Sequence, residues 1–235
     1  MVGKRTADVV AFRSVSYLCL GLYALMCLLP FAIIVAASFT DEMTILVNGY
    51  SLAPAKLSLS AYRMIFQVPQ KMLRAYGITI FSTGVGTALG LFLMSMAAYV
   101  LNRKDFRYRN GVAFYLYFTT LFSGGLVPYY ILMMKVFGLR NNILAIILPN
   151  LISVWSVLLM RNFMQSIPDS LYESAKIDGA GDFRIYLSII LPLSASSLAT
   201  IGLFQALAYW NEWYNAMLFF QDRDMFPLQL FLKNM

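Results

Sequence analysis

The chain has 235 residues, of which 60% are hydrophobic and only 12% are charged, and its mean hydropathy is +0.69. This balance excludes an ordinary soluble domain and predicts an integral membrane protein. The formal net charge of +7 does not indicate nucleic-acid binding, because the basic residues lie at the ends of apolar runs and not on one basic, aromatic-rich face.

The residue types also exclude several kinds of chemistry. The chain contains no histidine, which removes the commonest general base and metal ligand, and it contains no Gly-rich phosphate-binding loop. Any ATP hydrolysis is therefore expected on another chain. Cys19 and Cys27 lie about 12 Å apart along one predicted helix, too far to form a disulfide.

Apolar runs predict about five membrane-spanning helices, because each run is long enough to cross a hydrocarbon layer of about 30 Å. The first run is longer than the apolar part of a secretory signal, so we expect it to remain as a membrane helix. A short amphipathic helix is predicted at residues 60–66, within the first polar segment. The predicted spans are residues 15–39, 72–101, 112–134, 143–160 and 193–220.

Basic residues predict the orientation of these spans. A cluster between Arg103 and Arg109 follows the second span within one short loop. Short loops rich in Lys and Arg are typical of the cytoplasmic side, so the second span is predicted to run inward. The N-terminus, which carries Lys4, Arg5 and Arg13, is then predicted to be cytoplasmic.

Glycines within the spans predict how the helices pack. Gly86 and Gly90 are four positions apart, a spacing that lets another helix approach closely. Gly124, Gly125 and Pro128 interrupt the third span and predict a kink. We interpret this kink as a packing feature, although such a break can also line a transport pathway.

A long polar segment, residues 166–192, lies between strongly apolar runs and predicts two short helices joined by a turn. Pro168 suits the start of the first helix, because its missing N–H would have no partner there. Gly179 and Gly181 are expected to take a positive φ in the turn. Asp182 is expected to cap the second helix by accepting backbone N–H groups.

The polar segment also carries a spaced motif, formed by Glu173, Ala175, Gly179, Ile189, Leu191 and Pro192. It resembles the EAA loop of binding-protein-dependent ABC importer permeases, whose pattern runs from Glu-Ala-Ala through a Gly to Ile-x-Leu-Pro. Ser174 stands where that family has the middle Ala, a small-for-small difference that still permits close helix packing.

The resemblance implies an all-α integral membrane domain over residues 1–235, of the type I (MetI-like) ABC importer class. It also implies that residues 166–192 form a cytoplasmic coupling loop, which docks into a cleft on a separate ATPase subunit that holds ATP and Mg²⁺. Glu173 and Asp178 are expected to pair with basic groups of that ATPase or to cap the loop's own backbone. Because interface energy concentrates in a few apolar contacts, the expected anchors are Leu171, Ile177, Phe183 and Tyr186.

Segments outside this loop resemble the MalG-type permeases of carbohydrate importers, and more narrowly the LplC-type branch associated with complex or oligomeric sugars. These segments are residues 76–81, 98–106, 121–128, 166–169, 198–204, 210–211 and 227–230. The resemblance implies one of two permease subunits in a heterodimer in the bacterial cytoplasmic membrane, with an ATPase dimer inside and a solute-binding protein outside. The family pattern continues with a sixth membrane helix, so the chain is expected to be truncated or naturally short.

A second candidate site lies at the outer end of the last span, formed by Trp210, Asn211, Glu212 and Trp213. An ionisable group at membrane depth is costly and is a functional candidate, and flat aromatic faces suit the C–H faces of a sugar. Aromatic residues also gather at the bilayer interface of any membrane protein, and we favour that interpretation for the tryptophans. The resemblance is compatible with substrate contacts in this subunit and with contacts held mostly by its partner permease.

The predicted function is that of a permease subunit of an ATP-driven carbohydrate importer, which works by alternating access and binds no cofactor or metal itself. One alternative is an ABC permease for another solute, such as amino acids or polyamines, because the same loop would serve it equally. A secondary transporter is a further alternative. It would need intramembrane acidic or histidine relays, and Glu212 is the sole acidic residue within the predicted spans.

Overall fold

The computed structural model describes residues 7–53, 56–67 and 69–235, and helices make up almost all of their regular structure. Among these residues the β-structure is limited to one isolated bridge between Thr40 and Leu57. The predicted all-α class is therefore confirmed. Lys4 and Arg5, which contributed to the predicted orientation, lie outside the described residues.

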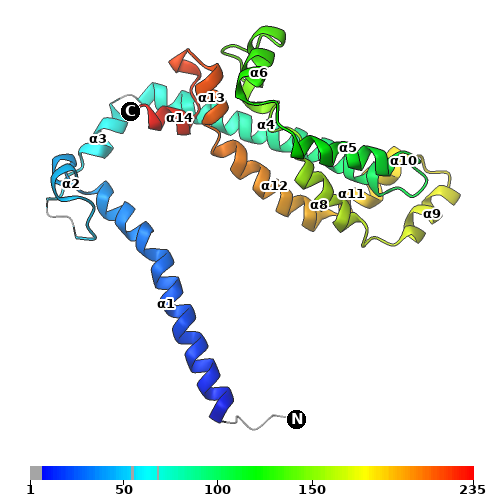
Figure 1. The fold of residues 1–235 in the computed structure, drawn as a ribbon, viewed down its shortest axis with the longest axis horizontal. Helices are drawn as coiled ribbons and strands as arrows, with labels where there is room; N and C mark the ends of the chain where they lie inside the picture. The colour runs from blue at the N-terminus through cyan, green and yellow to red at the C-terminus, as the bar shows by residue number, and fades with distance from the viewer. Residues whose placement is uncertain (1–6, 54–55, 68) are drawn as a thin grey trace. The chain divides into compact units, whose positions relative to one another are not determined.

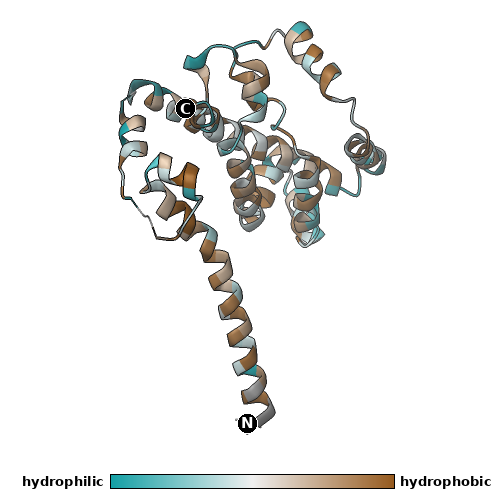
Figure 2. Ribbon diagram, turned by 60° about the vertical axis from the view of Figure 1, so that its left-hand side comes forward, coloured by the Kyte–Doolittle hydropathy of each residue, from teal (hydrophilic) through white to brown (hydrophobic). Residues whose placement is uncertain are grey.

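The chain divides into two units, Met1–Pro69 and Gln70–Met235, and the first contains one long membrane-type helix. Helix α1 (Ala7–Ser38) is apolar along nearly its whole length, as Figure 2 shows, and it confirms the predicted first span. None of its most apolar stretch is buried in the protein. A helix that is hydrophobic all round needs lipid or another protein around it, so α1 is suited to a membrane.

Two short helices, α2 (Glu42–Asn48) and α3 (Ser60–Phe66), follow α1, and α3 occupies the predicted positions. The segment around the bridge is joined by backbone hydrogen bonds, in which Asp41 N donates to Lys56 O at 3.1 Å and Ser58 N donates to Phe39 O at 2.8 Å. These bonds fix the chain as it leaves α1.

In the second unit the longest helix is α4, and α12 packs against it (Figure 1). Two of the glycines of α4, Gly86 and Gly90, make close approach of neighbouring segments possible. A Cβ added at Gly86 would overlap the ring of Tyr209, and one at Gly90 would lie 2.8 Å from the carbonyl oxygen of Leu151. The predicted role of this glycine spacing in close packing is confirmed. The helices of the unit are α4 (Pro69–Asn102), α5 (Arg109–Leu121), α6 (Leu126–Ile131), η1 (Leu132–Val136), α7 (Leu144–Ile147), α8 (Val154–Met164), α9 (Asp169–Ile177), α10 (Asp182–Ile185), η2 (Tyr186–Ile190), α11 (Leu191–Leu193), α12 (Ala195–Trp210), α13 (Tyr214–Phe219), η3 (Arg223–Met225) and α14 (Leu228–Lys233).

The predicted third span breaks more sharply than a kink. Helix α5 and the segment from α6 to η1 meet at 110°, and Gly125 takes a φ of 87° at the break. Such a φ is strained for any residue with a Cβ, so glycine suits this position. Pro128 lies in the first turn of α6, where its missing N–H leaves no helical bond unmade.

The predicted continuous helix over residues 143–160 is wrong. The chain forms the short helix α7, leaves helical structure at Leu148 and resumes with α8 at Val154. Pro149 lies in this break and cannot donate a backbone hydrogen bond. Ser153 then caps α8, because its hydroxyl accepts from Ser156 N at 3.3 Å.

Other breaks reduce the number of uninterrupted spans below the predicted five. The segment Asp182–Leu193 meets the segment Ala195–Phe219 at 81°, just after Pro192, and a second short break within Ala195–Phe219 separates α12 from α13. In the described part of the chain, two helices are long and apolar enough to cross a membrane alone, and four spans result if each bent pair counts as one.

Two apolar cores stabilise the second unit. The first core joins the end of α4 to α8 and to residues 175–190, and the second joins η1 and α7 to α13 and α14. The fully enclosed side chains of the first core include Met94, Met160, Ile185 and Tyr186. Those of the second core include Ile146, Phe219 and Leu230.

Candidate functional site

Residues 166–192, called the hairpin below, form two helices joined by a tight turn, as predicted. Pro168 precedes α9 in extended conformation (φ −60°, ψ 132°), and α9 ends at Ile177. Gly179 takes a φ of 79°, and Ala180 N donates to Ala175 O at 2.9 Å across the turn. Gly179 therefore has the predicted positive φ.

The predictions for Gly181 and Asp182 are wrong in detail. Gly181 has a φ of −72°, which any residue can adopt. Asp182 is the first residue of α10 and its side chain caps no backbone group of that helix. Instead its Oδ1 accepts from the Tyr172 hydroxyl at 2.7 Å and lies 3.0 Å from Lys176 Nζ. The carboxylate of Asp182 thus joins the two helices of the hairpin. The hydrogen bond between Lys176 and this carboxylate raises the pKa of Lys176.

The inner face of the hairpin is buried against the rest of the second unit. Ala175 is 8% exposed and Tyr186 is 1% exposed. The Tyr186 hydroxyl shares a hydrogen bond of 2.6 Å with Ser95 Oγ, and its ring lies 5.5 Å from that of Tyr99. Tyr186 was predicted to anchor a partner, and this prediction is wrong because the side chain is enclosed by its own chain.

The outer face of the hairpin carries the other three predicted anchors, which are available to a partner. Leu171 is 41% exposed, Phe183 is 56% exposed and Ile177, at the end of α9, is 86% exposed. Of the remaining predicted coupling residues, Glu173, Ser174, Asp178 and Pro192 are exposed, whereas Ile189 and Leu191 are half-buried against the first core. Neither Glu173 nor Asp178 forms an ion pair or a side-chain hydrogen bond with the described residues, so neither caps the hairpin.

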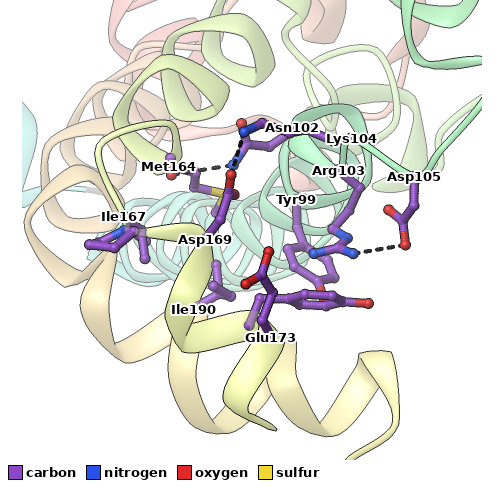
Figure 3. A pocket seen from close by; sticks show the side chains of 12 residues that line it. Tyr99, Asn102, Arg103, Lys104, Asp105, Met164, Ile167, Asp169, Glu173 and Ile190 are labelled. Carbon is purple, nitrogen blue, oxygen red and sulfur yellow. Dashed lines mark hydrogen bonds and ion pairs between the residues drawn. The ribbon is translucent and has the colours of Figure 1, made fainter. Parts of the chain in front are cut away.

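The loop between α4 and α5 contacts the hairpin beside a cavity of about 230 Å³, the loop pocket. The guanidinium carbon of Arg103 lies 3.0 Å from the centre of the Tyr172 ring, a cation–π contact. Figure 3 shows Arg103 also bonded to Asp105, with Nη2 and Oδ2 2.7 Å apart. This bond lowers the pKa of Asp105 below its ordinary value. Lys104 pairs with Asp169 at the start of α9.

Arg103, Lys104 and Tyr172 were not predicted to belong to this site. Arg103 and Lys104 were interpreted only as indicators of the cytoplasmic side, because the positive-inside rule counts basic residues in a loop and says nothing about which residues they contact. Tyr172 is 69 positions from Arg103, and no spacing rule connects residues so far apart in the sequence. The position of Tyr172 directly before Glu173 of the motif was the one feature of the sequence that could have indicated its place in this site.

The second candidate site is a polar network at the helix breaks. Glu212 Oε1 accepts from Asn215 N at 2.8 Å, and Oε2 accepts from Asn215 Nδ2 at 3.0 Å and from Asn150 Nδ2 at 2.5 Å. The Tyr129 hydroxyl donates to Asn215 Oδ1 at 2.8 Å. Glu212 thus bonds to the break between α7 and α8 and to the start of α13, and Asn215 links this pair to α6.

The other members of the predicted site lie at the surface around this network. Asn211 Nδ2 donates to the carbonyl of Leu207 at 2.8 Å, and Lys233 Nζ lies 3.8 Å from the centre of the Trp213 ring. Trp210 is exposed and makes no side-chain hydrogen bond with the described residues. The structure therefore brings together Glu212 and two asparagines, and it leaves the tryptophans on the outside.

Among the described residues, no group of three or more acidic, Cys or His side chains could hold a metal ion. The hairpin offers an apolar outer face to which a partner protein can bind. At the helix breaks, the hydrogen-bond network of Glu212 holds the surrounding segments together.

Comparison with known proteins places these features in a family. Residues 90–230 match the model of the "binding-protein-dependent transport system inner membrane component" family. The permease protein YtcP of the polygalacturonan/rhamnogalacturonan transport system of Bacillus subtilis is 40% identical over 94% of this chain and 77% of its own length. LplC of the same organism is 37% identical over 94% of this chain and 75% of its own length.

A solved structure gives the same result for the fold. The crystal structure of a bacterial ABC transporter involved in import of the acidic polysaccharide alginate contains a chain that matches 99% of this one, and 82% of that chain is covered. The TM-score is 0.85 and the sequence identity is 30%. The chain therefore belongs to the family of inner-membrane components of binding-protein-dependent transport systems, and it is a membrane-embedded transport subunit and not an enzyme.

Proposed function

We propose that this chain is a permease subunit of an ATP-driven oligosaccharide importer, and that the hairpin couples it to the ATPase. The proposed substrate class is supported by what the similar proteins are named for, namely import of polygalacturonan or rhamnogalacturonan and of alginate. The proposed partners are a second permease, a cytoplasmic ATPase dimer that binds ATP and Mg²⁺, and a solute-binding protein on the other side of the membrane.

The observation that carries the coupling role is the contrast between the two faces of the hairpin. Its inner face is buried, whereas Leu171, Ile177 and Phe183 are exposed on its outer face. Apolar side chains on a polar segment outside the membrane spans would contact water in the isolated chain, at a cost in free energy. A cleft on a partner protein would remove them from water, and a few such side chains are enough to dominate an interface.

The buried face supports a route by which movement of the hairpin reaches the membrane helices. Tyr186 bonds to Ser95 on α4, and Tyr172 lies against Arg103 directly after α4. Packed side chains transmit displacement because closely packed interiors resist compression. Movement of the ATPase would therefore displace the end of α4, as alternating access requires.

The polar network argues against the alternative of an ion-driven transporter. A proton or ion relay needs a carboxylate that can exchange its partners. Glu212 has three hydrogen-bond donors from the protein around it, which favours a fixed structural role.

Reconstitution tests the proposed function. Proteoliposomes should contain this chain with its second permease, ATPase and binding protein, and should be supplied with labelled galacturonan oligosaccharides, amino acids or polyamines. We expect ATP-dependent accumulation of the oligosaccharide that persists after an ionophore dissipates ion gradients. Accumulation of only the amino acid or polyamine would favour the other-solute alternative, and ionophore-sensitive, ATP-independent uptake would contradict the proposal.

Cysteine labelling tests the proposed orientation, with a cytoplasmic N-terminus. Cys19 and Cys27 are first replaced by Ser, and single cysteines are then placed at Asn110, Ser170 or Ser51. We expect the first two positions to react only with membrane-permeant reagents and Ser51→Cys to react with impermeant ones in intact cells. The reverse pattern would contradict this orientation.

A further inference from the structure

A second cavity, the basic cleft, lies where α4 ends, α5 begins and α8 ends. It has a volume of about 400 Å³ and shares Lys104 and Asp169 with the loop pocket, which Figure 3 shows. Its charged lining consists of three cations, Lys104, Arg109 and Arg161, and one anion, Asp169. The remaining polar side chains that line it are Asn102, Asn110, Gln165 and Ser166.

The positive charge in this cleft is not neutralised by the described residues. Asp169 pairs with Lys104. Neither Arg109 nor Arg161 forms an ion pair within the described parts of the chain. The Nε atom of Arg161 is also buried without a hydrogen-bond partner there. The guanidinium groups of Arg109 and Arg161 line the cleft and have no acceptor among the described residues, so their remaining N–H donors can bind an acceptor that enters the cleft from outside the chain.

The place of the cleft in the fold suggests the source of that acceptor. The candidate spans α4 and α5–α6 end or begin at its wall, and the apolar helix α8 ends there. The ends of membrane helices lie at the depth of the lipid headgroups. A guanidinium group binds a phosphate through two parallel hydrogen bonds, and basic pockets between membrane helices bind anionic headgroups.

We propose that the basic cleft binds a phosphate group, that of an anionic phospholipid headgroup, with Arg109 and Arg161 as its principal ligands. The uncharged side chains supply further donors to the phosphate oxygens. This site is separate from the outer face of the hairpin, so its occupancy and ATPase docking can be measured independently.

Lipid retention tests the proposal on the full chain. The chain is reconstituted into nanodiscs of phosphatidylcholine with a minority of phosphatidylglycerol, exchanged into a neutral detergent, and its retained lipid is quantified by mass spectrometry. We expect Arg109→Gln/Arg161→Gln to lower retained phosphatidylglycerol about tenfold or more. Arg161→Lys should lower it less, because it keeps the charge but not the two-pronged donor.

The matched control is Arg184→Gln, which removes one exposed cation from the hairpin outside the cleft and should leave retention unchanged. Size-exclusion chromatography and thermal unfolding verify that each variant is folded. A folded double variant that retains phosphatidylglycerol as well as the parent chain does would overturn the lipid assignment.

A second arm distinguishes a free ion from a lipid. Chains in pure phosphatidylcholine nanodiscs are titrated with radiolabelled inorganic phosphate. Saturable binding that the double variant loses, without selective phosphatidylglycerol retention, would keep the phosphate chemistry and assign a free ion to the cleft. Unchanged lipid and phosphate binding together with loss of co-purifying ATPase would overturn the proposal in favour of an acidic partner segment.

Discussion

The two ends of α4 are attached to the rest of the second unit in different ways. Near Asn102, the hairpin is attached by the exposed Lys104–Asp169 ion pair, by the Arg103–Tyr172 contact and by its one buried face, where Tyr186 bonds to Ser95. Toward the opposite end, the attachments are one exposed ion pair, Arg74–Asp224, and several buried hydrogen bonds. Leu228 N donates to Thr79 Oγ1 at 2.8 Å, and Tyr209 OH donates to Ile147 O at 2.8 Å.

This difference indicates which end is suited to exchange partners. Exposed ion pairs contribute little each, typically about 0–1 kcal/mol, and can be replaced by contacts to another protein. Buried polar groups cost more to separate, because each would remain unpaired in a place without water. We therefore expect changes at the hairpin to affect coupling more than stability, and changes at the helix breaks to affect stability more than coupling.

The largest expected effect is on the outer face of the hairpin. Ile177→Asp/Phe183→Asp should abolish co-purification of the ATPase and reduce ATP-dependent uptake to background, because two charges would enter an apolar interface. The stability of the chain should change by no more than about 0.5 kcal/mol, since both side chains are exposed. Asn162→Asp, an exposed change at the end of α8, is the control and should be neutral. Normal ATPase association in the double variant would contradict the claim that the hairpin end of α4 is the end that binds the ATPase.

The second prediction concerns the helix breaks. Glu212→Ala should lower the free energy of unfolding by about 2 kcal/mol or more, because Asn150 and Asn215 lose a charged acceptor. Thermal unfolding in detergent measures the change, and Glu42→Ala, which removes an exposed carboxylate, serves as the control. A Glu212→Ala chain that is fully stable but fails to transport would instead indicate a direct role in the pathway.

A smaller effect is expected where the hairpin meets α4. Arg103→Leu should leave ATPase binding intact, lower stability by about 1–2 kcal/mol and reduce the sugar transported per ATP hydrolysed. The Tyr172→Leu change should add little in the Arg103→Leu background, because both remove the same contact. Fully additive losses of stability in this double-mutant cycle would show that the two side chains are not energetically coupled.

The smallest effect depends on pH. The bond from Arg103 lowers the pKa of Asp105 in the folded chain relative to the ordinary value of 3.8. The stabilisation is therefore fully present above that value and is lost as the pH falls through the lowered pKa. Thermal unfolding of the parent chain and of Asp105→Asn should differ slightly at neutral pH and converge in strong acid. A difference that grows on acidification would contradict the assigned sign.

The sequence predicted features that depend on neighbouring residues. The uninterrupted apolar runs became α1 and α4, the Gly86–Gly90 spacing permitted close packing, and Gly179 adopted a positive φ. Each of these follows from local hydropathy or from the missing Cβ of glycine. Such features can therefore be predicted from residues that are close together in the sequence.

Features that depend on distant partners were predicted less well. Asp182 was expected to cap its own helix, but Tyr172 and Lys176 on the preceding helix offered its carboxylate alternative donors. Tyr186 looked like an exposed anchor because the sequence does not show that Ser95 lies beside it. The break at Pro149 was overlooked because an apolar run of sufficient length resembles one span even when it contains a proline.

The most direct test of the coupling role is a cross-linking measurement in membranes that hold the complete importer. A photoreactive amino acid is placed at Ile177 or, as the matched position off the hairpin, at Asn162. We predict that the probe at 177 forms a covalent adduct with the ATPase subunit and that the probe at 162 does not. An ATPase adduct from 162 alone, or adducts of 177 only with lipid, would contradict the assignment of the hairpin as the coupling element.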